Sequence, residues 1–375
     1  MKSIGLSVIV KNEMRVMRRC LESVAPILDY ALIVDTGSDD GTQSVARHLL
    51  KTLNIAGEVV EQPWRDFAFN RTDALQKLRE RKEMDYSLMI DADQVIVFGP
   101  DFSPDRFKAE LNCDVYDIKL ITGSIDYFVP NLVSNRIDVS YKGVLHEYRE
   151  CPAGCTRGTA TGLHILERQD SARSRNPHKF QHDAAVLEKV LETETDPFLI
   201  SRYKFYLAQS YRDAGDPERA LKTYLERAEL GFWDEEVFVS LYFAAKMKEI
   251  LKHPEAEIIQ IYLRASEVCS RRAEALHDAA RYCRLNGNYE QGYALAKQAL
   301  LKTCPASGLF IERWVYDHGL LDELAVLAYW SGRYEESHAA CMRLLDEGKV
   351  AADQHQRIRA NAAFAADKLG LVAAS

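Results

Sequence analysis

The chain has 375 residues, of which 47% are hydrophobic and 28% are charged, a composition typical of soluble globular proteins. This length predicts two or three domains, each large enough to bury its own core. The net charge of −8 disfavours a polyanionic partner bound over a broad basic face, and no apolar run approaches the ~20 residues that span a bilayer.

Up to about residue 165, short apolar runs alternate with helical patterns. The runs are rich in Val and Ile and lack polar alternation, as strands buried on both faces do. This alternation of strands and helices predicts a parallel α/β sheet. The expected strands are 5–10, 30–35, 56–62 and 85–91, and the expected helices are 14–24, 40–53 (capped by Asp39 or Asp40) and 67–82.

Residues 113–150 are strand-like but irregular, and we expect them to add mixed or antiparallel strands to one edge of the sheet. From about residue 180 the pattern is helical. Two amphipathic helices meet at a turn at 214–217, similar turns recur within 285–300 and 329–345, and a degenerate copy lies at 251–268. Glycines mark the turns and small residues follow at close-packing positions: Gly215, Gly287 and Gly332, then Ala220, Gly292 and Ser337.

The second half therefore resembles tetratricopeptide repeats, which are helix pairs with a period near ~34 residues. A plain helical bundle is the alternative, because the spacing here is irregular. Either architecture is expected to provide a groove for binding rather than catalytic residues. We expect three parts: an α/β domain at 1–170, a basic linker with a connecting helix at 171–198, and a helical repeat domain at 199–375.

Polar groups follow several of the expected strands in the first half. Ligands of open parallel sheets bind outside the carboxyl ends of the strands, so these groups are expected to share one edge. Singly, each suits a cap or a turn; together they indicate a site. They are Lys11, Asn12 and Glu13 after the first strand, Asp35 to Asp40 after the second, and Asp91 and Asp93 after the fourth.

The chemistry that fits this edge is nucleotide-sugar binding. Asp91 and Asp93 form a D-x-D pair, and in a strand both would point to the same side. Two such carboxylates suit Mg²⁺ or Mn²⁺, hard ions that prefer oxygen ligands and neutralise a leaving diphosphate. Asp35 is placed to accept hydrogen bonds from a ribose or a pyrimidine N–H.

Four motifs carry a family resemblance: "LSVIVKNE", "ALIVDTGSDDGT", "WRDFAFNRTDAL" and "YSLMIDADQVI". In this order and spacing they resemble the successive motifs of family 2 glycosyltransferases of GT-A fold, over about residues 4–170. "NLVSNRIDVSYKGVLHEY" resembles a later segment of the subgroup that carries tetratricopeptide repeats. The resemblance implies transfer of a sugar from a nucleoside diphosphate, most often UDP, usually with inversion and with Mg²⁺ or Mn²⁺.

The resemblance also implies residue roles. Gln94 departs from the family pattern, which commonly has an acid there, and this weakens the case for a metal. The matched positions are Asn12 and Glu13 near the nucleobase, Asp35 on uracil or ribose, Arg71 near base and phosphates, Asp91 and Asp93 on the metal, His146 and Glu147 on the acceptor side, and His164 as a further metal or phosphate ligand.

Inversion requires a base that takes a proton from the acceptor. Glu147 is the first candidate and Asp126 a weaker one; alternatively, Glu147 pairs with an arginine such as Arg136 or Arg149 and holds the loop. His146 and His164 are open to purely structural roles as well.

The basic stretch 166–180 is either a solvated linker or a loop that closes over the diphosphate, where Arg173 and Arg175 would bind phosphate oxygens.

Two other classes compete with the enzyme hypothesis. The chain could be a scaffold or peptide-binding repeat protein with a decayed transferase domain, although the intact Asp35, Asp91 and Asp93 argue against decay. A nucleotidyltransferase would need a Gly-rich loop after its first strand, and "VKNEMRVM" has no glycine.

The acceptor is open among a polypeptide, a glycan, a lipid-linked sugar and a modified nucleic acid, and the repeats could instead form a homodimer. Met1-Lys2 leads directly into a strand pattern without a signal peptide. Eight scattered cysteines include one C-x3-C, Cys151 and Cys155, which reads as a turn rather than a zinc site without further ligands. We expect a cytoplasmic protein with reduced thiols.

Overall fold

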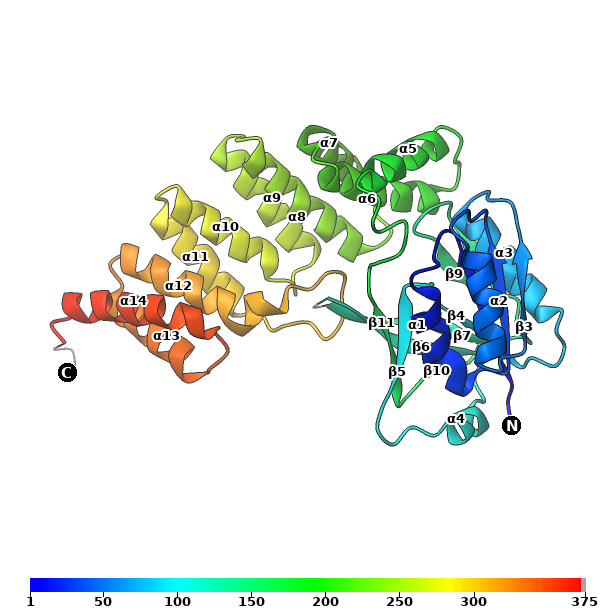
Figure 1. Ribbon diagram of the computed structural model, residues 1–375. Helices are drawn as coiled ribbons and strands as arrows, with labels where there is room; N and C mark the ends of the chain where they lie inside the picture. Colours follow the sequence, from blue (N-terminus) through cyan, green and yellow to red (C-terminus); the bar gives the residue numbers. More distant parts are fainter. Residues whose placement is uncertain (124, 372–375) are drawn as a thin grey trace. The chain divides into compact units, whose positions relative to one another are not determined.

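The computed structural model describes residues 1–123 and 125–371. Over these residues the chain forms two compact units, Met1–Thr193 and a second that begins at Glu194. The first is a mixed α/β domain and the second is helical, which confirms the predicted fold class (Figure 1). None of the described helices is long and apolar enough to cross a membrane.

Parallel strands form one half of the sheet. β1 pairs with β2 on one side and with β4 on the other, and β2 pairs with β3. The strands match the predicted apolar runs to within two residues. The bounds are β1 (Ile4–Val10), α1 (Met17–Val24), η1 (Ala25–Ile27), β2 (Tyr30–Asp35), α2 (Thr42–Thr52), β3 (Gly57–Glu61), α3 (Phe67–Arg79) and β4 (Tyr86–Met89).

Mixed strands continue the sheet on the β4 side, as the irregular pattern predicts. The order is β3-β2-β1-β4-β7-β6-β11-β5, with β7 antiparallel to β4, while β10 also pairs with β6 and β8 pairs with β9. β5 and α4 are elements that sequence reasoning missed. The bounds are β5 (Gln94–Phe98), α4 (Pro104–Glu110), β6 (Val115–Thr122), β7 (Ile125–Ser134), β8 (Ser140–Lys142), β9 (Tyr148–Glu150), β10 (Arg157–Thr159), β11 (Leu163–Glu167) and α5 (Lys179–Leu191).

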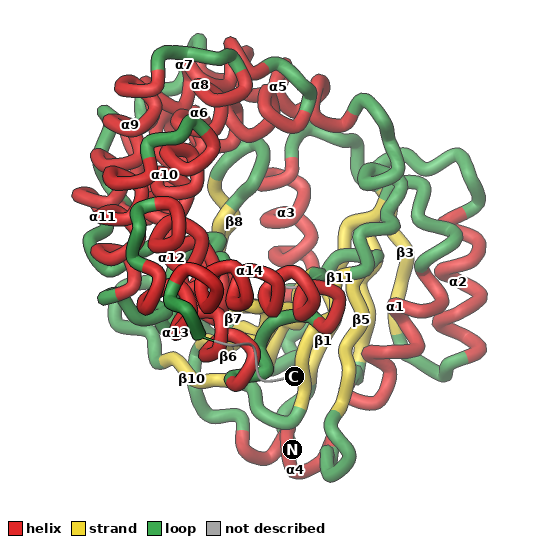
Figure 2. The backbone as a smooth tube through the Cα atoms, turned by 90° about the vertical axis from the view of Figure 1, so that its left-hand side faces the viewer, coloured by secondary structure: helices red, strands yellow, loops and turns green. Residues whose placement is uncertain are grey.

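Helices cover both faces of the parallel strands. Leu6 and Leu88 pack in one cluster with residues of α1 and α2, whereas Leu32 and Val34 pack in another with residues of α3. Figure 2 shows α1 and α2 on one side of the strands and α3 on the other. Burial on both faces explains the missing polar alternation and leaves the loops at the carboxyl ends of the strands as the place for polar groups.

The helical unit contains four successive helix pairs, each packed against the next, and then α14, which packs on α13. The pairs are α6 with α7, α8 with α9, α10 with α11 and α12 with α13. This is the arrangement of tetratricopeptide repeats. The bounds are α6 (Pro197–Asp213), α7 (Pro217–Ala228), α8 (Asp234–Ile250), α9 (Glu255–Val268), α10 (Glu274–Leu285), α11 (Tyr289–Leu300), η2 (Val315–Gly319, a π-helical turn), α12 (Leu320–Trp330), α13 (Tyr334–Asp346), η3 (Ala352–Gln354) and α14 (His355–Lys368).

The turns within these pairs share one geometry. In each turn one residue adopts a left-handed conformation. The backbone N–H of the next residue donates to the carbonyl of the residue five positions before it. Lys252, with φ of 56°, takes the place of glycine in the turn of the degenerate copy. The bonds are Asp216 N to Tyr211 O (2.8 Å), His253 N to Lys248 O (3.0 Å), Asn288 N to Cys283 O (2.9 Å) and Arg333 N to Ala328 O (2.8 Å).

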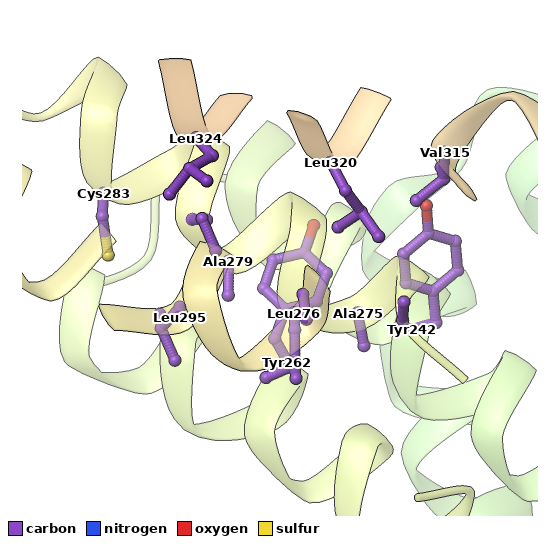
Figure 3. Close-up of a cluster of buried hydrophobic side chains, with 14 of the residues drawn as sticks. Tyr242, Tyr262, Ala275, Leu276, Ala279, Cys283, Leu295, Val315, Leu320 and Leu324 are labelled. Atoms are coloured by element: carbon purple, nitrogen blue, oxygen red, sulfur yellow. The ribbon is translucent and has the colours of Figure 1, made fainter. Parts of the chain in front are cut away.

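Close packing explains the small residues that follow these turns. A Cβ on Gly292 would approach Leu327 Cδ2 to 2.7 Å and Ala280 O to 3.0 Å, so the helices here leave no room for a side chain. Ala220 and Ser337 are buried at the equivalent positions. Figure 3 shows part of the resulting core, with side chains from α8 to α12 in contact in one hydrophobic cluster.

A buried ion cluster lies beside this core. Arg272 is 1% exposed, and its guanidinium donates to Glu235 Oε2 at 2.7 Å and to Glu274 Oε1 at 2.8 Å. It also donates to the carbonyl of Leu309 at 2.8 Å. The cluster thus joins α8, α10 and the segment between α11 and η2.

Candidate active site

The carboxyl ends of β1, β2 and β4 bring the predicted polar groups to one edge of the sheet. β1 lies between β2 and β4, so the order of connections changes beside it, which is where open α/β sheets bind ligands. Asn12 and Glu13 follow β1, Asp35 ends β2, and Asp91 and Asp93 follow β4.

The loops after β1 and β2 hold each other. Asn12 adopts a left-handed conformation with φ of 59°, which asparagine tolerates better than most residues. Its backbone N–H donates to Ser38 Oγ at 2.8 Å, and its side-chain Oδ1 accepts from the N–H of Asp39 at 2.9 Å. The sequence predicted Asp39 or Asp40 as the N-cap of α2, but the N-cap residue is Gly41. Asp40 Oδ1 instead accepts from the N–H of Thr42 at 2.9 Å.

Asp35 is fully buried and already ordered for binding. Its Oδ1 accepts from the N–H groups of Gly37 at 2.9 Å and Ser38 at 2.8 Å, and from Gln43 Nε2 at 3.2 Å. Burial opposes its ionisation, but these hydrogen bonds outweigh burial and hold the pKa of Asp35 below its usual value. Its Oδ2 has no hydrogen-bond partner among the described residues, so this carboxylate keeps an acceptor for a ligand.

Asp91 and Asp93 lie in a turn rather than in a strand. β4 ends at Met89, and the N–H of Gln94 donates to the carbonyl of Asp91 at 3.0 Å, which closes a β-turn. The expected alternation of strand side chains therefore does not apply to this pair. Gln94 Oε1 accepts from the backbone N–H of Asp91 at 3.1 Å, so the residue that replaces the common acid helps to shape the turn.

Arg71 of α3 is placed between two carboxylates. Its Nη2 lies 2.6 Å from Asp91 Oδ1 and its Nε lies 2.6 Å from Glu147 Oε1. The Nε–H is not aligned with that oxygen, so the second contact is an ion pair without a hydrogen bond. Although burial opposes its charge, the negative charges of Asp91 and Glu147 raise the pKa of Arg71 above its usual value.

Asp93 and Glu13 accept hydrogen bonds from the segment between β11 and α5, residues 168–178, which we call the covering segment. The N–H of Ser171 donates to Asp93 Oδ2 at 3.3 Å, and the N–H of Ala172 lies 3.1 and 3.2 Å from the two oxygens of Glu13. Burial, reinforced by the charge of Asp91, raises the pKa of Asp93. Burial also raises the pKa of Glu13, to about 7.

Ion pairs hold the covering segment in place. Arg19 of α1 binds Asp170 through two bonds of 2.9 and 2.6 Å. Arg173 donates to Asp183 of α5 at 2.5 Å, and Arg175 donates to the carbonyl of Asp170 at 3.0 Å. Both arginines expected to contact phosphate are therefore engaged within the first unit.

Comparison with protein families bears on this edge. Residues 6–99 match the family model described as "Glycosyl transferase family 2". That range includes Asn12, Asp35, Arg71, Asp91 and Asp93. The matched part of the first unit is therefore similar to family 2 glycosyltransferases.

Several solved structures are similar to part of the chain. The crystal structure of BtubC (BKLC) from P. vanneervenii is 14% identical, with 54% of this chain and 86% of that chain covered and a TM-score of 0.39. MamA is 14% identical, with 48% and 94% covered and a TM-score of 0.37. YrrB, described as a TPR protein with an unusual peptide-binding site, is 10% identical, with 49% and 84% covered and a TM-score of 0.37. No curated protein matches the chain.

Two other predicted residues lie on neighbouring strands of the first unit. His164 of β11 is opposite Val97 of β5, whereas Glu167 is opposite Gln94. Glu167 marks the end of β11 nearest Asp93. His164 lies three residues, roughly 10 Å, away from that end along the strand. Asp126 is exposed near the β6–β7 hairpin, with its carboxylate 3.1 Å from Lys119 Nζ.

The remaining two expected residues lie beside members of the site. Lys11 is exposed directly after β1. His146 is exposed in a left-handed conformation, with φ of 52°, next to Glu147.

Sequence reasoning missed several groups that shape this site. The covering segment supplies backbone N–H groups, which leave no side-chain signal in a sequence. Glu167 also acts on Asp93, because its charge contributes to the raised pKa of Asp93. Thr42 was within the "GSDDGT" run but unassigned; its hydroxyl accepts from the N–H of Glu13 at 2.8 Å.

The carboxylates of Asp91 and Asp93 are the candidate ligands for a divalent cation. The described residues include no group of three or more His, Cys, Asp and Glu side chains that could hold a metal ion. Asp91 and Asp93 nevertheless provide hard oxygen ligands, and Mg²⁺ and Mn²⁺ commonly complete their coordination with water and phosphate oxygens. The like charge that raises the pKa of Asp93 is one that a cation would relieve. These residues fit such an ion.

Proposed function

We propose that this protein is a metal-dependent, inverting glycosyltransferase. It would transfer a sugar from a UDP-sugar to an acceptor. The observation that carries the proposal is the meeting of Asp35, Asp91 and Asp93 at one edge of the sheet, inside the range that matches glycosyl transferase family 2. The nucleotide would lie over the ends of β1 and β2 and the diphosphate near the end of β4.

Asp35 would bind the nucleoside. Its Oδ1 is held by two backbone N–H groups, while its buried Oδ2 is left to accept from a ribose hydroxyl or a uracil N–H. A buried acceptor that is unsatisfied without ligand gives selectivity, because a ligand lacking the donor leaves it unpaired. Asn12 and Glu13 would border the base, and Lys11 is exposed at the same loop.

Asp91 and Asp93 would hold Mg²⁺ or Mn²⁺. When bound, such an ion neutralises the charge that develops on the leaving diphosphate. The covering segment currently bonds to Asp93, so donor binding requires Ser171 to release that carboxylate. Arg173 and Arg175 would leave Asp183 and the carbonyl of Asp170 to bind phosphate oxygens, in the role predicted from the sequence.

Glu147 would serve as the base. The acceptor hydroxyl attacks the anomeric carbon from the face opposite the diphosphate, the new C–O bond forms as the bond to the diphosphate breaks, and Glu147 takes the proton. His146 would contact the acceptor beside it. This mechanism uses neither Asp126, whose carboxylate pairs with Lys119, nor His164, which lies farther along β11.

The acceptor would be selected with help from the helical unit, whose stacked helix pairs form the kind of surface that binds extended partners. A non-catalytic scaffold is the second candidate, favoured by one observation: in this structure Asp91, Asp93 and Glu13 are all engaged by protein groups. The two candidates differ in whether a nucleotide sugar displaces those groups.

The test is a thermal-shift screen of UDP-, GDP- and dTDP-sugars with and without Mn²⁺, followed by hydrolysis of the stabilising donor. We expect a UDP-sugar to stabilise the protein and to be hydrolysed slowly. Asp93→Ala should reduce hydrolysis on the order of a hundredfold. Asp138→Ala is the matched control, because that aspartate is 90% exposed and pairs with Arg79 rather than with a residue of the site. Absence of stabilisation by every donor, or equal hydrolysis by Asp93→Ala, would favour the scaffold.

A further inference from the structure

Protein groups enclose Arg71 on several sides. Its side chain is 14% exposed, and its guanidinium carbon lies 5.8 Å from the ring centres of both Phe67 and Tyr141. Its contacts at 2.6 Å run to Asp91 and to Glu147. Family resemblance suggested that this arginine contacts base and phosphates, but its charge here is already matched by two protein carboxylates.

The two carboxylates come from distant parts of the chain. Asp91 lies in the turn after β4, whereas Glu147 directly precedes β9. Two like charges brought to one guanidinium would repel each other without it. Arg71 therefore fixes where the Glu147 carboxylate lies relative to Asp91, and α3 and the aromatic rings fix Arg71 in turn.

We propose that Arg71 is a positioning residue that links the metal-binding Asp91 to the base Glu147, an inference that rests on the proposed function. One planar guanidinium holds the donor side of the reaction and the acceptor side at a set separation. Lysine cannot replace it, because an ammonium is a point charge without the fixed fork that spans two carboxylates. The consequence is that Arg71 governs turnover rather than donor affinity.

The first experiment separates these two effects. UDP affinity is measured by calorimetry with Mn²⁺, and hydrolysis of a UDP-sugar gives kcat and KM, for wild type, Arg71→Lys and Arg71→Met. At Mn²⁺ concentrations that saturate each variant, we expect kcat to fall at least tenfold in both variants while UDP affinity and donor KM stay within about threefold. A loss of UDP affinity as large as the loss of kcat would overturn the inference and return Arg71 to a donor-binding role.

The second experiment needs no activity. Unfolding by urea is followed for Arg71→Met, Glu147→Gln and the double variant, and the stabilities are compared as a double-mutant cycle. We expect the double variant to lose clearly less than the sum of the two single losses. Strict additivity would show that Arg71 does not hold Glu147, and it would refute the proposal.

Arg79 and Asp138 give the matched control. Arg79 also lies on α3 with 12% exposure, but its partner Asp138 is 90% exposed, so the cycle of Arg79→Met and Asp138→Asn should be nearly additive. If wild type neither binds UDP nor hydrolyses a UDP-sugar, the proposed function fails. The urea cycle still decides whether Arg71 positions Glu147.

Discussion

Glu13 is a buried acid whose surroundings favour its neutral form. Only 7% of its surface is exposed, and burial together with the charge of Asp93 raises its pKa to about 7, against the opposing hydrogen bond from Ala172. In the unfolded chain its pKa returns to about 4.5. Between these values the folded protein binds more protons than the unfolded chain, so stability falls as pH rises through this window.

Replacement of Glu13 should remove that pH dependence. Wild type is expected to lose on the order of 3 kcal/mol between pH 4.5 and 7 through this group, and Glu13→Gln, which cannot ionise, should lose correspondingly less. Urea unfolding at pH 5 and pH 8 measures the difference. The control is Glu22→Gln, since Glu22 is an exposed partner of Arg18. An unchanged pH slope in Glu13→Gln would contradict the prediction.

For single residues, the sequence predicted which side chains lie at the site better than it predicted which groups they contact. Asn12, Asp35 and Asp91 could be placed together because each follows a recognisable apolar run, and parallel strands end at a common edge. The pairing of Arg71 with Glu147 depends on how α3 packs against the loop before β9, and no local pattern encodes that contact. The same holds for Asp93, whose partner Ser171 is a backbone group 78 positions later.

At the level of elements, the turns of the helical unit show how one geometry tolerates different residues. Lys252 occupies the left-handed position with φ of 56°, where glycine occurs in the other three pairs. Because a Cβ in this region clashes with the neighbouring carbonyl, the lysine costs about 1–2 kcal/mol. Lys252 is exposed, so its side chain offers little packing in return.

Lys252→Gly should therefore stabilise the protein by about 0.5–1 kcal/mol, since relief of backbone strain exceeds the added freedom of the unfolded chain. The reverse change at an equivalent turn, Gly215→Ala, should destabilise it by about 1–2 kcal/mol. Urea midpoints of the helical unit's transition measure both. A stability loss in Lys252→Gly would show that the turn is not strained.

Element prediction succeeded where periodicity was strong and failed where elements were short. β1 to β4 and the helix pairs follow clear apolar patterns, and Gly215, Gly287 and Gly332 marked their turns in advance. β5 was missed because "QVIVF" follows Asp93 without an intervening turn signal, and its partner β11 joins it only through the tertiary fold. The D-x-D pair was expected at a strand end, whereas the chain already turns there.

On the scale of the whole molecule, each unit has a core of its own. Leu6 is buried in the main cluster of the first unit and Leu276 in that of the second. Separate cores allow separate cooperative transitions, as is common in proteins of more than one domain.

Calorimetry should thus resolve two transitions, each sensitive to one core. Leu6→Ala and Leu276→Ala both remove a fully buried side chain, and each should cost about 2–5 kcal/mol in its own unit. We expect Leu6→Ala to lower the melting temperature of one transition by several degrees and Leu276→Ala to lower that of the other. A single transition moved equally by both variants would mean that the units unfold together.

The cluster around Arg272 has a consequence for how the helical unit folds. Helix pairs of a repeat array assemble through contacts close in sequence, which form quickly. Arg272 instead joins Glu235, Glu274 and the carbonyl of Leu309, so its bonds cannot all form until the chain has closed a loop of more than seventy residues. Burial of a guanidinium is unfavourable until all of its hydrogen-bond partners are in place. We therefore expect this junction, rather than any single helix pair, to set the rate at which the helical unit reaches its native state.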